Sequence, residues 1–172
     1  MHYTVKNLLN IENSIKAHLN KLNINNHPKI IAGQGTVGKE IWEDADFDID
    51  YIIAPVGGGG LSAGIGTYIK HYSPKTHIIG IEPEGAPAML RSIEAGHVVV
   101  LEEIDKFVDG AAVKKVGKYT YDICSRVLDQ VLTVPEGKVC GTILELYNNQ
   151  AIVVEPAGAL SIPSLDNCRE DI

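Results

Sequence analysis

The sequence predicts an α/β fold in which a parallel β-sheet carries helices on both faces. Segments typical of strands alternate with segments typical of helices along the chain, and this is the order that a parallel sheet requires. The clearest strand segments, 51–56 (YIIAPV) and 151–154 (AIVV), are unbroken apolar runs, as expected for strands that are buried on both faces. The 172 residues are enough for one domain with a sizeable core. We therefore expect residues 1–172 to form a single domain.

The first third of the chain predicts two helices before the first strand. Residues 4–23 place apolar side chains at spacings of three, four and seven, which is the stripe of an amphipathic helix. Ala32 to Thr36 is expected to turn, with Gln34 and Thr36 in structural roles. Thr36 then caps a second helix that continues to about Trp42.

The rest of the chain alternates strands and helices. The expected strands are 51–56, 77–82, 131–134 and 151–154. The expected helices are 62–71, 87–95, 119–127, 136–149 and a short final one that begins in 155–163.

Four consecutive glycines, Gly57 to Gly60, separate the first strand from the helix that follows it. Without side chains the backbone can pack closely around a ligand, and the free N–H groups of a helix start favour an anion there. One or two glycines would be enough for a plain turn. Four in a row favour a loop that binds phosphate.

The bulk composition excludes several classes of function. The formal net charge is −7, and no basic stripe is present to bind nucleic acid or an anionic membrane. No apolar run approaches the roughly 20 residues of a membrane span, and residues 1–13 do not resemble a secretory signal. Three widely separated cysteines indicate free thiols in a reducing cytoplasm. The six histidines show no metal-ligand spacing.

Two kinds of nucleotide site compete for the glycine loop on the residues alone. A P-loop needs Gly-Lys-Ser/Thr, whereas Gly60 is followed by Leu61 and Ser62. A dinucleotide fold is the better rival, because Gly58-x-Gly60-x-x-Ala63 fits the relaxed fingerprint and Glu82 ends the next strand. A nucleotide- or dinucleotide-binding domain therefore stays open as an alternative.

Five motifs stand in an order that resembles the large domain of the threonine dehydratases. They are 31–41 (IAGQGTVGKEI), 55–65 (PVGGGGLSAGI), 78–89 (IIGIEPEGAPAM), 107–117 (FVDGAAVKKVG) and 152–160 (IVVEPAGAL). The fold implied is that of the tryptophan synthase β-subunit. The DGAAVKKVG version is most similar to biosynthetic threonine ammonia-lyases, with serine racemases and serine dehydratases as close relatives.

The resemblance implies pyridoxal 5′-phosphate as the cofactor and L-threonine as the substrate, which is converted to 2-oxobutanoate and ammonia in isoleucine biosynthesis. It also implies a cytoplasmic enzyme whose full-length form is a homo-oligomer. The implied cofactor-binding residues are the phosphate loop, the glycine of DGAAV against the cofactor ring, and the carboxylate of EPAGA near that ring: Gly57, Gly58, Gly59, Gly60, Leu61, Gly110 and Glu155.

Some parts of the family pattern are missing. None of the twelve lysines stands in the Ser-Phe-Lys-x-Arg-Gly context of the family's Schiff-base lysine, so no catalytic residue is assigned and the chain is expected to be an inactive fragment. Serine racemase-like members bind a divalent cation at positions matching Glu82, Ala86 and Ala88. Because the third position lacks a carboxylate here, we expect no metal.

Overall fold

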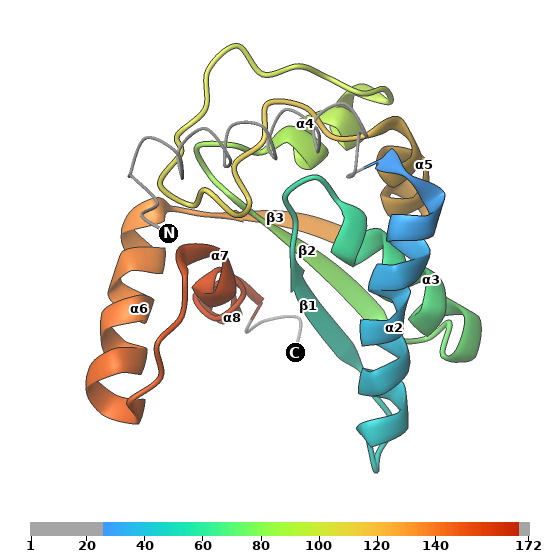
Figure 1. Cartoon of the computed structure of the whole chain (residues 1–172), viewed down its shortest axis with the longest axis horizontal. Coiled ribbons are helices and arrows are strands. Elements are labelled where there is room, and N and C mark those ends of the chain that lie inside the picture. The colour runs from blue at the N-terminus through green and yellow to red at the C-terminus, as the bar shows by residue number, and fades with distance from the viewer. Residues whose placement is uncertain (1–25, 169–172) are drawn as a thin grey trace, which may run out of the picture.

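The computed structural model describes residues 26–168, which build a three-stranded parallel sheet with the order β1-β2-β3 (Figure 1). The strands are β1 (Tyr51–Pro55), β2 (His77–Pro83) and β3 (Gln130–Val134). Tyr51 pairs with His77, and Ile79 pairs with Gln130. The expected α/β fold class is confirmed. The helix predicted over residues 4–23 lies outside the described residues.

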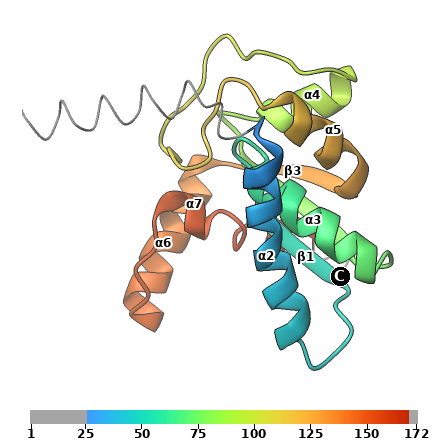
Figure 2. The ribbon, with the colours of Figure 1, turned by 45° about the vertical axis from the view of Figure 1, so that its right-hand side comes forward.

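Helices cover both faces of this sheet. On one face lie α2 (Pro28–Asp44) and α3 (Gly60–Tyr72), and on the other lie α6 (Glu136–Gln150) and α7 (Pro156–Ala159) (Figure 2). The neighbouring residues Ile78 and Ile79 illustrate the division, because successive side chains of a strand point to opposite faces. Ile78 packs with Ile65 and Ile69 of α3, whereas Ile79 packs with Val139 of α6.

Two further helices pack around this sheet: the first follows the end of β2, and the second lies beside α3 and leads into β3. They are α4 (Ala88–Ala95) and α5 (Lys118–Val127), and a last short helix, α8, covers Leu165–Cys168. Met89 of α4 and Cys124 of α5 are completely buried and share a core cluster with Val56 and Ala63. Among residues 26–168, none of the helices has the length and apolar character needed to cross a membrane.

The predicted turn at Ala32 to Thr36 is wrong, because α2 runs through it without interruption. The helix begins instead at Pro28, whose fixed φ suits the first helical position, after the N-cap His27, whose Nδ1 accepts the N–H of Lys29 at 3.2 Å. Thr36 is not a cap, since its hydroxyl donates to the carbonyl of Gly33 inside the helix at 2.8 Å.

The strand predicted at 151–154 is also absent. Ala151 ends α6 in the left-handed conformation, with φ of 55°, and residues 152–155 pass into α7 without joining a ladder. A strand needs a neighbour for its backbone hydrogen bonds, and the described part of the chain pairs none with this run. Val153 is accordingly 82% exposed despite its apolar side chain.

Candidate functional site

A cavity of about 430 Å³ lies where β1 ends and α3 begins. Its walls come from α2, from the glycine loop (Gly57–Gly60) with Leu61, from the turn at Gly110, and from the segment that starts at Glu155. All seven residues predicted to bind a cofactor line this one cavity. The fold therefore brings together segments that are about a hundred positions apart in the sequence.

The glycine loop turns sharply into α3. Gly59 is the N-cap residue and has φ of +84°, a conformation that side chains disfavour. The Ser62 hydroxyl donates to the carbonyl of Pro55 at 3.0 Å, and the N–H of Ala63 donates to the carbonyl of Gly59 at 2.9 Å. The first bond ties the helix start to the strand end, and the second closes the first turn of α3 on its N-cap residue. The first N–H groups of α3 have no partner inside the helix, so this end of the cavity favours an anion.

Side chains of α4 and α5 pack against the glycine loop at Gly59. A β-carbon on Gly59 would lie 2.6 Å from Cε of Met89 and 3.1 Å from Cβ of Thr120. The Cys124 thiol donates to the carbonyl of Gly59 at 3.5 Å. Burial, together with the negative charge of Glu82, raises the pKa of this thiol to about 12, so it stays protonated and can donate. The loop is thus held by contacts as well as by its own turn.

The opposite wall is formed by Gly110 and Glu155. A β-carbon on Gly110 would lie 2.9 Å from Cβ of Ala157 and 3.4 Å from Oε1 of Glu155. A side chain at Gly110 would therefore displace the wall beside the carboxylate. Glu155 is the N-cap residue of α7, but its side chain makes no cap hydrogen bond, so the carboxylate is not engaged by the helix that follows it.

Helix α2 contributes two lining residues that sequence reasoning missed as part of a site. Ile30 and Gln34 face the glycine loop, one helical turn apart. Gln34 was expected to shape a turn, so its place in a cavity wall was missed. The signal that could have found it is the spacing of four between these two residues, read as one face of a helix.

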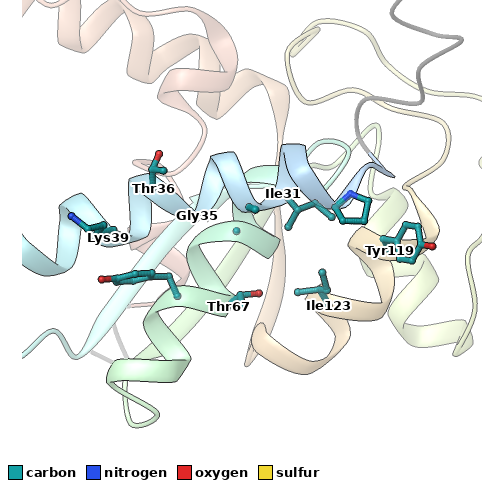
Figure 3. A pocket seen from close by; sticks show the side chains of 11 residues that line it. Ile31, Gly35, Thr36, Lys39, Thr67, Tyr119 and Ile123 are labelled. Atoms are coloured by element: carbon teal, nitrogen blue, oxygen red, sulfur yellow. The ribbon is translucent and has the colours of Figure 1, made fainter.

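The other side of α2 lines a separate apolar cavity of about 450 Å³. Figure 3 shows Ile31, Gly35, Thr36 and Lys39 of α2 on this side, together with Thr67 of α3 and Tyr119 and Ile123 of α5. None of the seven predicted residues lines it. Its walls are mainly hydrocarbon, and it lacks the run of glycine backbone that makes the first cavity suitable for a phosphate.

Glu82 does not line the cavity of the glycine loop. Its side chain is completely buried, and its two carboxylate oxygens accept the N–H groups of Met89 at 2.7 Å and Leu90 at 2.8 Å. Burial raises the pKa of Glu82 to about 7, although these two N–H groups act in the opposite direction. In a dinucleotide-binding domain this carboxylate must be free to accept a hydrogen bond from the ribose hydroxyl. The engaged oxygens of Glu82 therefore argue against the dinucleotide alternative.

Among the described residues, the cavity has neither a metal cluster nor a lysine. Within residues 26–168, no group of three or more histidine, cysteine, aspartate or glutamate side chains could hold a metal ion. No lysine of the same residues lines the cavity of the glycine loop.

The sequence of this chain is similar to a family of cofactor-dependent enzymes and to individual members named as threonine dehydratases. The family model described as pyridoxal-phosphate dependent enzyme matches residues 6–172. The biosynthetic L-threonine dehydratase IlvA of Halalkalibacterium halodurans is 59% identical over 144 residues, which are 84% of this chain and 35% of that protein. The chain spans about a third of the length of the curated relatives it matches.

Two solved structures named as threonine deaminases have the same fold. The T.th. enzyme superimposes with a TM-score of 0.81 at 36% identity, over 86% of this chain and 55% of that one. The processed isoform 2 from Solanum lycopersicum superimposes with a TM-score of 0.77 at 40% identity, over 80% of this chain and 40% of that one. Because the family model covers nearly the whole sequence, the chain belongs to the family of pyridoxal-phosphate dependent enzymes.

Proposed function

We propose that this chain is the cofactor-binding part of a threonine ammonia-lyase, which converts L-threonine to 2-oxobutanoate and ammonia. The observation that carries the proposal is the cavity in which the glycine loop, Gly110 and Glu155 meet. The name of the relative that is 59% identical supports the choice of substrate.

The residues of the cavity fit pyridoxal phosphate. A β-carbon on Gly60 would have no neighbour within 4 Å, so the start of α3 leaves space for a phosphate next to its free N–H groups. Gly57, Gly58, Gly59, Gly60 and Leu61 would hold that phosphate. The absence of side chains in the loop lets the backbone N–H groups approach the phosphate oxygens directly.

Gly110 and Glu155 would hold the cofactor ring. Gly110 would present its backbone to the ring, and a larger residue there would meet Ala157 and Glu155. The Glu155 carboxylate would help to orient the ring. Bound pyridoxal phosphate supplies an electron sink for the charge that is left on the substrate when its α-proton is removed.

We further propose that the complete enzyme is a cytoplasmic homo-oligomer acting in isoleucine biosynthesis. The word biosynthetic in the names of the relatives supports the pathway, and the net charge of −7 suits an enzyme in solution. A Schiff-base lysine is required for the reaction, and no lysine of this sequence stands in the family's context. The reaction therefore depends on residues beyond those of this chain.

The test of cofactor binding is a titration of the purified chain with pyridoxal phosphate, followed by absorbance and thermal unfolding. NAD and inorganic phosphate serve as comparison ligands. We expect pyridoxal phosphate to raise the unfolding temperature by mass action and NAD to leave it unchanged. Stabilisation by NAD alone would instead support the dinucleotide alternative.

The test of the substrate is a chimera. Residues 26–168 replace the corresponding residues of the Halalkalibacterium halodurans enzyme, and release of 2-oxobutanoate from L-threonine and of pyruvate from L-serine is measured. We expect activity with a preference for threonine. A folded chimera that binds pyridoxal phosphate and prefers serine would favour a serine dehydratase, and conversion of L-serine to D-serine would favour a racemase.

A further inference from the structure

The buried carboxylate of Glu82 is linked to the glycine loop through a single helix. Glu82 is 0% exposed and accepts the N–H groups of Met89 and Leu90 in the first turn of α4. Pro87 is the N-cap residue of α4 and makes no side-chain cap bond. Without Glu82, these two N–H groups would face an apolar interior with no acceptor.

The same turn of α4 carries the side chain that presses on the loop. Met89 is also 0% exposed. Its Cε lies so close to Gly59 that a β-carbon added to this glycine would be only 2.6 Å from it. Gly59 has no side chain of its own to fix its place. Besides its own turn and the bond from Ala63, its position is therefore set by what packs against it from α4 and α5.

We propose that Glu82 is a positioning residue for the phosphate loop, acting through the first turn of α4 and through Met89. The proposal rests on the proposed function, in that the glycine loop holds the phosphate of the cofactor. It assigns to Glu82 a role that does not require a metal ion, since both of its oxygens are already engaged by α4.

Four single variants of the full chain separate positioning from simple stability. Glu82→Ala removes both acceptors, and Met89→Ala removes the contact with Gly59. Ser92→Ala is the matched control, because Ser92 is equally buried in α4 and bonds to Ala88 and Val99 rather than to the loop. Glu82→Gln, which keeps one acceptor oxygen, provides a milder variant should Glu82→Ala fail to fold.

The first readout is binding of pyridoxal phosphate. We expect Glu82→Ala and Met89→Ala to weaken it about tenfold each, Glu82→Gln to weaken it less, and Ser92→Ala to leave it unchanged. The double variant Glu82→Ala/Met89→Ala should lose little more than either single variant, because both changes act on the same contact. Normal binding by Glu82→Ala would overturn the proposal.

The second readout needs no ligand. The N–H of Ala63 donates to the carbonyl of Gly59, so hydrogen exchange at Ala63 reports on the loop itself. We expect Glu82→Ala and Met89→Ala to speed this exchange about tenfold relative to Ser92→Ala. Equal rates in all three variants would overturn the proposal. If the two variants exchange faster but the wild-type chain does not bind pyridoxal phosphate, the proposed function is contradicted, whereas the positioning role of Glu82 is supported.

Discussion

Gly35 of α2 and Gly64 of α3 meet backbone to backbone, so the two helices cross without any side chain between them. A β-carbon on Gly64 would lie 2.5 Å from the backbone nitrogen of Gly35 and 2.6 Å from the carbonyl oxygen of Ile31. Two helices that touch in this way fix each other's position closely. Since α3 starts at the glycine loop, this crossing also fixes one wall of the cavity.

Substituting Gly64 by alanine should therefore destabilise the protein. We expect a loss of about 1–3 kcal/mol in the free energy of unfolding, because the helices must separate to admit the methyl group. The control is Gly33→Ala in the exposed middle of α2, where a β-carbon has no neighbour within 4 Å. This change should stabilise by about 0.5–1 kcal/mol through helix propensity. Denaturant unfolding of both variants measures the contrast, and equal effects would contradict the close crossing.

Substituting Gly60 by aspartate should strongly weaken phosphate binding while preserving the fold. The new side chain has room, and a carboxylate in the first turn of a helix is favourable. It would nevertheless occupy the cavity, where like charges about 4 Å apart repel by about 4 kcal/mol, so affinity for pyridoxal phosphate should fall by roughly a hundredfold or more. Gly137→Asp makes the same change at the start of α6, also in open space. Weakened binding in both variants would argue against the glycine loop as the site.

Glu82 should make stability fall as the pH rises. Its pKa is raised by burial from 4.5 to about 7 in the folded protein, so between these values the folded chain retains a proton that the unfolded chain has released. The stabilisation is complete below pH 4.5 and is lost as the pH passes 7, a change of about 3 kcal/mol. The neighbouring Cys124 thiol, with its pKa raised to about 12, does not titrate in this window.

The check on this pH effect is the difference between the wild-type chain and Glu82→Gln, measured by denaturant unfolding from pH 4.5 to 8. Subtracting the variant removes the contribution of groups that titrate elsewhere. We expect the wild type to lose stability relative to the variant across this range. A constant difference would show that Glu82 keeps its ordinary pKa when folded.

The chain alone should bind pyridoxal phosphate without forming a specific covalent bond. No lysine of residues 26–168 lines the cavity, so borohydride reduction followed by peptide mass spectrometry should find no single labelled lysine. Release of 2-oxobutanoate from L-threonine should also be absent. One specifically labelled lysine, lost when Gly60→Asp blocks the cavity, would show that another lysine reaches the cofactor.

The sequence was a good guide wherever the pattern was local. The strand at 51–56, the four glycines and the following helix share one short stretch, and their geometry follows from burial and from glycine itself. The prediction for 151–154 failed because an apolar run becomes a strand only beside another strand. The turn at Ala32 to Thr36 was predicted from the glycines in this stretch. Gly35 is needed instead for the close contact of α2 with α3, which is a feature of the tertiary structure.

Seven residues of the candidate cavity could be named from the sequence, whereas their arrangement could not, and their role in binding a cofactor stays a prediction. The glycine loop, Gly110 and Glu155 were named from motifs, whereas Gln34 entered the wall through a helix that was predicted to be interrupted. Glu82 shows the limit most clearly. Its position at the end of a strand suggested a carboxylate that binds ribose. Its actual partners are backbone N–H groups, and these cannot be recognised from the types of the neighbouring residues.

The cavity of the glycine loop draws its walls from Ile30 near one end of the described chain and Gly158 near the other. No sub-segment contains the site, so it comes into existence only when the most distant contacts have formed, and these are the slowest to close. A ligand that binds only the complete cavity would not bind collapsed or partly folded forms. It would therefore shift the equilibrium towards the native state. The cofactor would then bind, and so stabilise, only chains whose folding is complete.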